Sequence, residues 1–298
     1  MTPARPLPGW PQDHPAHTDP DLAPWAEGIN ELCPDSVLVR TLRYVRGRRV
    51  AAQVKTATGD EAVIKVYARP RARGNDRRLR ILADSTAAPW LPAPLGADRR
   101  GHVLALTYTP GIPMPELDHE GYVSVAGGAG EALRRLHDSK VVLDRAWLME
   151  QEATQLIRTC GPLTTPTTSA FLADLDARHW EQPELVCAHR DFHPQQVVAG
   201  PTRTASLIDL DDAAQAPRAL DTGNFTAHLR YDALQHRRTT GLVSQALAAF
   251  RDGYADLPDD HHRWETLALL RLAGLAETRH NDSNGGAALL VLAAVVDR

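Results

Sequence analysis

Two aspartates, one amide and one lysine have the types and spacing that phosphoryl transfer to a hydroxyl requires. Asp191 ends the apolar piece ELVCAHR, Gln196 follows five residues later, and Asp209 ends a second apolar piece, TASLI, 18 residues beyond Asp191. Loops that follow two such pieces can meet in one cleft. There, one carboxylate can orient and deprotonate a hydroxyl, while an amide oxygen and the second carboxylate hold Mg²⁺. Lys65, in EAVIKV, can neutralise phosphate charge.

Each of these residues also has a purely structural interpretation. A single loop aspartate is usually a turn former, Lys65 can be a solvated lysine on an edge strand, and Gln196 can be an ordinary loop residue. Asp211 fits either a second metal contact or a helix cap. His193 is expected to be packed or solvent-facing rather than catalytic. The functional interpretation depends on both aspartates occurring in the right order.

The elements that must position these residues begin with a β-rich segment. Residues 36–66 alternate apolar and polar side chains around a turn at 57–60, which predicts a three-stranded antiparallel meander. A short helix follows, with Asn75 or Asp76 as its expected cap. A further strand pair is expected over 94–109.

Most of the remaining chain is expected to be helical, interrupted around 185–212. Helical periodicity marks the segments 125–139, 170–180 and 239–296. The sequence therefore predicts an α+β protein with two lobes. Its expected divisions are a Pro-rich arm over 1–25, an N-lobe with the antiparallel sheet over 26–109, and a helical C-lobe over 110–298.

These motifs resemble the aminoglycoside phosphotransferase family, part of the protein-kinase-like superfamily that includes choline kinases and maltokinases. HRDFHPQQVV is similar to the family's catalytic loop HGDxHPxN, and SLIDLDDA to its metal segment. EAVIKVYA resembles the strand with the nucleotide-binding lysine, LTYTPGIPM the hinge, GEALRRLHDS the helix before the catalytic loop, and ALDTGNF a helix start. The motifs occur in the family's order, from about residue 36 to 270. The resemblance implies a protein-kinase-like two-lobed fold.

The resemblance also implies roles. Asp191 would be the catalytic base and Asp209 the main Mg²⁺ ligand, with Gln196 as the second ligand where asparagine is most common. Lys65 would contact the α- and β-phosphates of ATP or GTP, and Tyr108 lies in the hinge whose backbone would contact the base. His189 and Asp221 would have structural roles. His189 would buttress the catalytic loop, and Asp221 would hold the loop backbone together.

Some positions depart from the family pattern. Arg190 replaces the usual glycine, and only Gly47 occupies the hairpin where a glycine-rich loop is common. No glutamate lies between Lys65 and the hinge, so either Asp76 or Asp84 is the partner of this lysine or the phosphates alone hold it. Only 12 positions separate Asp209 from Asp221, which leaves no room for a protein-kinase activation segment and favours a small-molecule kinase.

Composition narrows the class of protein. The 298 residues carry a formal net charge of −4 and have ordinary globular composition, which argues against a nucleic-acid partner. Three separated cysteines give no disulfide framework or zinc motif and suggest a cytoplasmic location. No apolar run is long enough to span a membrane, so no membrane partner is expected. Oligomeric state stays open.

Four functions are compatible with the sequence. The first is a kinase acting on a small-molecule hydroxyl, as in an antibiotic or aminocyclitol, a sugar or an amino alcohol. The second is a kinase of peptide Ser or Thr in natural-product maturation, and the third is a catalytically impaired nucleotide-binding module. The fourth is a metallohydrolase built on His189, Asp191 and His193, which is disfavoured because no second ligand motif accompanies the other histidines.

Overall fold

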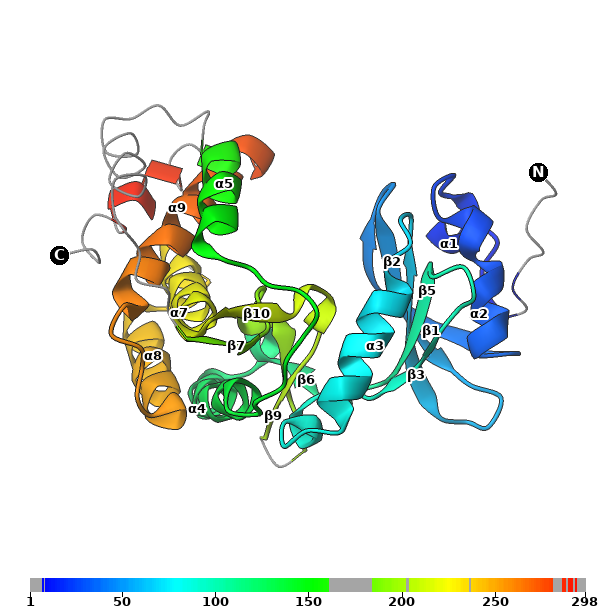
Figure 1. The fold of residues 1–298 in the computed structure, drawn as a ribbon, viewed down its shortest axis with the longest axis horizontal. Helices are drawn as coiled ribbons and strands as arrows, with labels where there is room; N and C mark the ends of the chain where they lie inside the picture. The colour runs from blue at the N-terminus through cyan, green and yellow to red at the C-terminus, as the bar shows by residue number, and fades with distance from the viewer. Residues whose placement is uncertain are drawn as a thin grey trace. The chain divides into compact units, whose positions relative to one another are not determined.

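The structure is a computed structural model that describes residues 7, 9–160, 184–201, 204–235, 237–280, 286–287, 289–291 and 293 (Figure 1). The chain forms two compact units, Met1–Pro110 and Gly111–Arg298. The boundary between them falls inside the hinge-like motif LTYTPGIPM, one residue from the expected division. Each unit has its own core and is described separately.

The first unit is built on a five-stranded antiparallel sheet with the order β1-β2-β3-β5-β4. The strands are β1 (Val37–Val45), β2 (Arg49–Lys55), β3 (Glu61–Tyr67), β4 (Pro94–Ala97) and β5 (Val103–Thr107). The first three strands confirm the predicted meander, and the last two confirm the predicted strand pair. In β2 and β3, every second residue is fully buried, because successive side chains of a strand point to opposite faces.

The amino-terminal segment packs on this sheet, which differs from the expected arm over 1–25. It contains α1 (Pro15–Thr18) and η1 (Ala23–Trp25), followed by α2 (Glu27–Leu32). Trp10 and Leu22 are buried in one cluster with Val54 and Ile64 of the sheet. The described part of the segment is therefore an integral part of the core of this unit. The apolar residues that anchor it are widely spaced among prolines and give no helical or strand period.

One helix, α3 (Ala72–Ala83), runs beside β4 and β5. It starts earlier than predicted, and the residue that caps its amino end, Arg71, makes no side-chain capping bond. Asn75 is not a cap but a buried residue of the first turn, where its Nδ2 donates to the Tyr67 hydroxyl at 3.5 Å. A 3₁₀ turn, η2 (Ala88–Trp90), leads on to β4.

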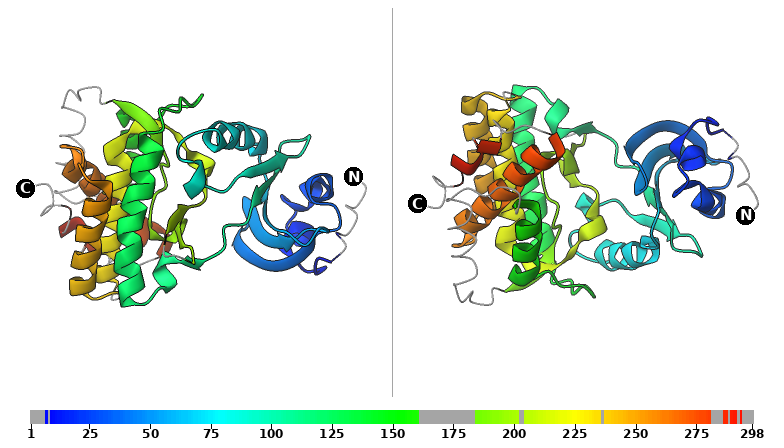
Figure 2. Two further views of the ribbon diagram at one scale, coloured as in Figure 1. Left: turned by 90° about the horizontal axis from the view of Figure 1, so that it is seen from below. Right: turned by 90° about the horizontal axis from the view of Figure 1, so that it is seen from above.

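The second unit is mainly helical, as predicted. Its long helices are α4 (His119–His137), α5 (Met149–Cys160), α7 (Arg218–Leu234), α8 (Thr240–Tyr254) and α9 (His261–His280). Helix α8 packs on α4, and α9 packs on α7 and α5 (Figures 1 and 2). The helix expected over 170–180 lies outside the described residues. The long helical pattern after 239 divides into α8 and α9, with Ala255 at a positive φ of 70° between them.

Two small sheets complete the second unit. One has the order β6-β8-β9 and the other pairs β10 with β7. The strands are β6 (Ile112–Pro113), β7 (Leu185–Ala188), β8 (Val197–Ala199), β9 (Ala205–Leu207) and β10 (Ala214–Pro217), and the 3₁₀ turns are η3 (Met114–Glu116), η4 (Pro194–Gln196) and η5 (Leu210–Asp212). Gly111 precedes β6 at a φ of 148°, where a Cβ would lie 2.1 Å from the Ala199 carbonyl oxygen. Only glycine permits this approach.

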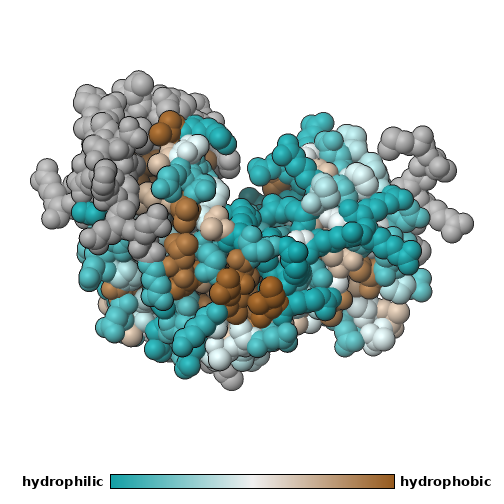
Figure 3. Space-filling model, in the orientation of Figure 1, coloured by the Kyte–Doolittle hydropathy of each residue, from teal (hydrophilic) through white to brown (hydrophobic). Residues whose placement is uncertain are grey.

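On the face drawn in Figure 3, polar residues predominate among those that the structure describes, and some apolar residues are also exposed. The exposed large apolar residues include Val142 and Ile157, at 78% and 55% exposure. Isolated residues of this kind are normal on a protein surface. In the part of the chain that the structure describes, no helix is both long enough and apolar enough to cross a membrane.

Candidate functional site

The β8–β9 hairpin brings Gln196 and Asp209 to the same end of one sheet. Val197 of β8 pairs with Leu207 of β9, so the residues just outside this pair continue the ladder. There, the Ile208 amide donates to the Gln196 carbonyl at 2.9 Å. Asp209 comes next and adopts a left-handed conformation, with φ 62° and ψ 47°. The register of this short hairpin therefore explains why Gln196 and Asp209 lie at the same end of the sheet.

His189 joins the loop of Asp191 to the loop of Asp209. Its fully buried ring donates from Nε2 to the Ile208 carbonyl at 2.8 Å. This fixes the tautomer, because Nδ1 then accepts from the Asp191 amide at 3.4 Å. Both ring nitrogens of His189 are thus used within the two loops, which matches the buttressing role that the family resemblance implies.

Asp221, in the first turn of α7, holds the backbone that leads to Asp191. Its two carboxylate oxygens accept from the amides of His189 and Arg190, each at 2.7 Å. His137 of α4 adds a contact from Nε2 at 3.1 Å, and its Nδ1 meets the Tyr254 hydroxyl at 2.7 Å. Burial raises the pKa of Asp221, but the contact with His137 and the hydrogen bond from the His189 amide outweigh this effect. The pKa of Asp221 therefore lies below its usual value. Asp221 is therefore a charged, fully paired anchor.

The carboxylate of Asp191 is accessible, with its side chain 48% exposed. The residue after it, Phe192, is fully buried and stacks on Phe225 with ring centroids 4.8 Å apart. Asn224 of α7 donates from Nδ2 to the Phe192 carbonyl at 2.8 Å. The burial of Phe192 and the hydrogen bond to its carbonyl thus fix the backbone next to Asp191, while the Asp191 carboxylate itself is exposed to solvent.

His193 lies between Asp191 and Gln196 without a close bond to the carboxylate, since its Nε2 is 3.9 Å from the Asp191 oxygen. Its ring stacks on that of His228 at 4.7 Å. Burial lowers the pKa of His193 and lowers that of His228 well below the usual value. A neutral His193 can accept at Nε2 from the Gln196 amide nitrogen, 3.3 Å away. In this arrangement the Gln196 amide oxygen is left for another partner.

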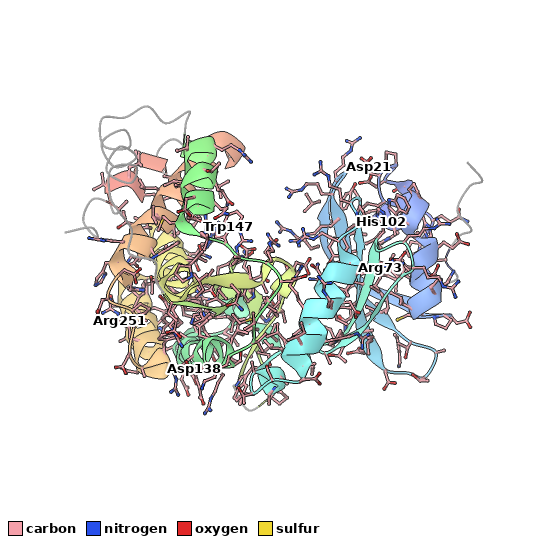
Figure 4. The ribbon with its side chains drawn as sticks, in the orientation of Figure 1. Asp21, Arg73, His102, Asp138, Trp147 and Arg251 are labelled. Carbon is pink, nitrogen blue, oxygen red and sulfur yellow. The ribbon has the colours of Figure 1, made fainter. Side chains whose placement is uncertain are left out.

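Arg190, where the family usually has glycine, lies flat on Trp147, with its guanidinium 3.5 Å from the ring centroid. One of its terminal nitrogens donates to the Asp212 carbonyl at 3.3 Å. Burial and the nearby Arg145 lower the pKa of Arg190 to about 10, so it stays charged at neutral pH. Trp147, labelled in Figure 4, lies two residues before α5. Arg190 therefore links the loop of Asp191 to the segment before α5.

A polar network that sequence reasoning missed supports the same loop from three helices. Arg271 of α9 donates to Asn224 Oδ1 and to Glu152 of α5, the latter at 3.2 Å. Glu152 also accepts from Trp147 Nε1 at 2.9 Å. Asn224 lies in the quoted motif ALDTGNF, but no local pattern connects it with residues 72 positions upstream and 47 positions downstream.

The remaining candidates lie in the first unit. Lys65 is 6% exposed on β3, paired with β2 and β5, so it is not a solvated residue of an edge strand. Of its two candidate partners, Asp76 pairs with Arg80 at 2.9 Å and has its Oδ1 buried without a hydrogen bond, whereas Asp84 is exposed at the end of α3. The Tyr108 amide donates to the Glu61 carbonyl at 3.3 Å, next to the end of the sheet.

The hairpin between β1 and β2 lacks a glycine-rich loop but is held by another device. Gly47 turns the chain at a φ of 65°, and its amide donates to Asp19 Oδ2 at 2.8 Å. Tyr44 donates its hydroxyl to the same oxygen at 2.9 Å. Asp19 therefore ties the amino-terminal segment to this turn. Arg46 and Arg48, beside Gly47, are exposed.

The family model described as "Phosphotransferase enzyme family" matches residues 44–280 of the chain. No curated protein matches the sequence.

Three solved structures have a similar fold. An aminoglycoside-3'-phosphotransferase of type VIII gives a TM-score of 0.63 at 18% identity, over 85% of this chain and 99% of the other. A spectinomycin phosphotransferase in complex with ADP and spectinomycin gives 0.57 at 13% identity, over 88% and 93%. A choline/ethanolamine kinase family protein from Mesorhizobium loti gives 0.57 at 15% identity, over 83% and 84%. At these identities, the likeness establishes the fold.

Proposed function

Because the chain belongs to the phosphotransferase enzyme family, we propose that it transfers the γ-phosphate of ATP or GTP to a hydroxyl of a small molecule with the help of Mg²⁺. The main observation behind the proposal is a pair of hydrogen bonds at Ile208. The Ile208 amide donates to the Gln196 carbonyl, and the Ile208 carbonyl accepts from the His189 ring. These two hydrogen bonds join the loop of Asp191 to the loop of Asp209. The two aspartates and Gln196 therefore lie in loops that are hydrogen-bonded to each other.

Asp191 is the residue that contacts the acceptor. Its half-exposed carboxylate can accept a hydrogen bond from a substrate hydroxyl and take up its proton as the phosphoryl group is transferred. The carboxylate can do so only if it is held still, because positioning supplies most of the catalysis in this type of reaction. The bonds to Asp221 and Asn224 provide this rigidity.

The donor set at the end of the β8–β9 hairpin fits Mg²⁺. Carboxylate and amide oxygens are hard ligands of the kind that Mg²⁺ prefers, and it completes its shell with water and phosphate oxygens. Asp209 supplies the carboxylate, and the hydrogen bond to neutral His193 orients the Gln196 amide so that its oxygen is available. When bound, Mg²⁺ would neutralise charge on the triphosphate.

In the first unit, we assign Lys65 to the α- and β-phosphates and the hinge segment with Tyr108 to the base of the nucleotide. The position of Lys65 supports this assignment, because its side chain is buried on a strand between β2 and β5 and is not a solvated surface lysine. Asp76 is the better of the two candidate acidic partners, since Asp84 is exposed.

The acceptor is an antibiotic or aminocyclitol, a sugar or an amino alcohol. The names of the similar structures support this range, because they include an aminoglycoside phosphotransferase, a spectinomycin phosphotransferase and a choline/ethanolamine kinase family protein. The short interval between Asp209 and Asp221, which contains only the η5 turn, β10 and the start of α7, also favours a small acceptor.

A panel of hydroxyl compounds from these classes, incubated with ATP or GTP and Mg²⁺, tests the proposal. Asp191→Asn should lower turnover by at least about 100-fold while nucleotide still binds, since a positioned base contributes about 10²–10⁴-fold. Asp209→Asn should lower turnover and also weaken Mg²⁺-dependent nucleotide binding. Asp256→Asn, at an exposed position outside the site, is the matched control. Near wild-type turnover by Asp191→Asn would refute the role of the base. Nucleotide binding without turnover on any acceptor would instead indicate an impaired module.

A further inference from the structure

The first turn of α9 holds a cluster of potential metal ligands for which the proposed phosphotransfer has no use. Among the described residues, His261, His262 and Glu265 form a group whose ligand atoms all lie within 4.8 Å of one another. The three residues occupy positions i, i+1 and i+4 of a helix, so one helical turn brings them together. No residue of the Asp191–Asp209 site belongs to this group.

Glu265 provides the observation that points to a ligand. Its side chain is fully buried, and Oε1 accepts from Arg230 Nε at 2.7 Å. Its second oxygen, Oε2, is buried without any hydrogen-bond partner. The nearest partners are imidazole nitrogens, His262 Nδ1 at 3.9 Å and His261 Nε2 at 4.0 Å. A buried carboxylate oxygen without a partner is unfavourable, and a cation between these three atoms would supply the missing partner.

His261 is oriented as a ligand. Thr222 donates its hydroxyl to the Ala219 carbonyl at 3.4 Å, which leaves its oxygen to accept from His261 Nδ1 at 3.0 Å. Nε2 of His261 then carries the lone pair and lies 4.0 Å from Glu265 Oε2. Fixing one ring nitrogen in this way is typical of metal-binding histidines. The Thr226 hydroxyl is 3.5 Å from Nε2 of His261, so a bound ion must replace that contact.

From this geometry we propose that His261, His262 and Glu265 form a binding site for a zinc-like divalent ion, which fastens the first turn of α9 to α7. Two imidazole nitrogens, one carboxylate oxygen and a water molecule are a common ligand set for Zn²⁺. Ligand atoms about 2.1 Å from a tetrahedral ion lie about 3.4 Å apart. The two separations from Glu265 Oε2, 3.9 and 4.0 Å, must therefore shorten by about half an ångström, and the separation between the two imidazole nitrogens, which is within 4.8 Å, by up to about 1.4 Å. The His262 side chain, 60% exposed, has the freedom to make this movement.

The site is rigid on the side of α7. Gly223 of α7 packs against the backbone of α9 so closely that a Cβ would lie 2.5 Å from the Glu265 amide nitrogen.

The ligand set of the α9 site also differs from that proposed for Mg²⁺, which prefers oxygen ligands only. The zinc-like site is therefore independent of the proposed phosphotransfer, and the two can be tested separately. Arg230 already neutralises Glu265, so the ion must compete with an existing ion pair.

The test uses the full chain, freed of metal with a chelator and titrated with Zn²⁺ by calorimetry and by competition with a chromophoric chelator. We expect one tight equivalent, and a rise in thermal stability on addition of Zn²⁺. His262→Ala should weaken Zn²⁺ binding by at least about tenfold, because altering even an outer partner of a metal ligand has an effect of that size. The metal-free stability of this variant should match wild type, since the replaced side chain is largely exposed. Glu265→Gln should abolish the tight equivalent.

Two further variants locate the ion. His119→Ala, at an exposed histidine of α4 whose ring contacts Gln245 at 3.3 Å, should bind Zn²⁺ as wild type does. His193→Ala should also retain the tight equivalent, which separates the α9 site from the metallohydrolase interpretation of the catalytic loop. The proposal is overturned if wild type takes up no Zn²⁺, if His262→Ala and Glu265→Gln bind it unchanged, or if His193→Ala is the variant that loses it. Phosphotransfer by His262→Ala should stay at the wild-type rate.

Discussion

An Asp221→Asn substitution tests how the loop of Asp191 is held, because this buried carboxylate accepts hydrogen bonds that one amide cannot replace. Asp221 Oδ1 accepts from the Arg190 amide, and Oδ2 accepts from the His189 amide and from the His137 ring. Asparagine keeps the shape of the side chain but offers only one oxygen. Its NH₂ group must then face either the Arg190 amide or the two donors at His189 and His137.

The expected loss follows from the number of bonds. A hydrogen bond to a charged group contributes about 1.5–3 kcal/mol, and breaking a buried charged pair by altering one partner is unfavourable by about 3–5 kcal/mol. We therefore expect Asp221→Asn to lower the free energy of unfolding by about 3–5 kcal/mol, out of a typical total of about 5–15 kcal/mol. Turnover should fall as well, since the backbone that leads to Asp191 loses an anchor.

Urea denaturation of wild type, Asp221→Asn and a matched control measures this loss. The control is Asp138→Asn, which removes an exposed carboxylate that pairs with Arg218 at 2.8 Å and is 51% exposed. A surface pair of this kind contributes less than about 1 kcal/mol. The reasoning is refuted if the Asp221 variant is no less stable than the Asp138 variant, with the same denaturant slope.

The pH dependence gives a second check on the same residue. The folded pKa of Asp221 lies below its ordinary value of 3.8, so the unfolded chain binds the proton more tightly. The stability that the charged form contributes is therefore fully present above pH 3.8 and is lost as the pH falls through the folded pKa. The difference between wild type and Asp221→Asn should stay constant near neutrality. A difference that already vanished at mildly acidic pH would contradict the assignment of a charged Asp221.

Two further substitutions test local features of the two units. Asp19→Ala should free the turn at Gly47, so that amide hydrogen exchange there becomes at least about tenfold faster, as the loss of a charged hydrogen bond predicts; unchanged exchange would show that Tyr44 and Asp19 do not hold the turn. At Arg190, whose φ is 71°, glycine should be more stable than alanine by about 1 kcal/mol, because both lose the contact with Trp147 but only glycine adopts this conformation without strain. Equal thermal stability of the two Arg190 variants would contradict that account.

The parts of the fold and site that depend on short-range pattern were predictable from the sequence. The meander over 36–66 has a clear period of two and a Thr-Gly-Asp turn, and β1 to β3 follow it closely. Gln196 and Asp209 come together because only a short hairpin separates them, and their order along the chain was sufficient to expect it. The hydrogen bonds that hold the loop of Asp191, by contrast, come from residues 19 to 32 positions away.

Features that depend on contacts between distant segments were not predictable in the same way. Glu152, Asn224 and Arg271 lie on three helices, and no periodicity connects them. The helix cap expected at Asn75 was wrong because tertiary burial against Tyr67 decides the position of this side chain. By contrast, the pattern His261-His262-x-x-Glu265 was visible in the sequence. Its meaning depends on those residues being helical and on the burial of Glu265, which only the structure shows.

The two loops of the candidate site share an unfavourable backbone conformation, and this explains why so many buried groups surround them. Arg190 and Asp209 both have positive φ values, 71° and 62°, although neither is glycine. Such conformations are unfavourable by about 1–3 kcal/mol each and persist only where the surroundings impose them. Asp221 imposes the conformation of Arg190 by accepting hydrogen bonds from the amides of His189 and Arg190. The hydrogen bond from the Ile208 amide to the Gln196 carbonyl holds the residue before Asp209. The position of Asp191 is therefore set by buried residues of α7 and the hairpin rather than by the preferences of its own loop.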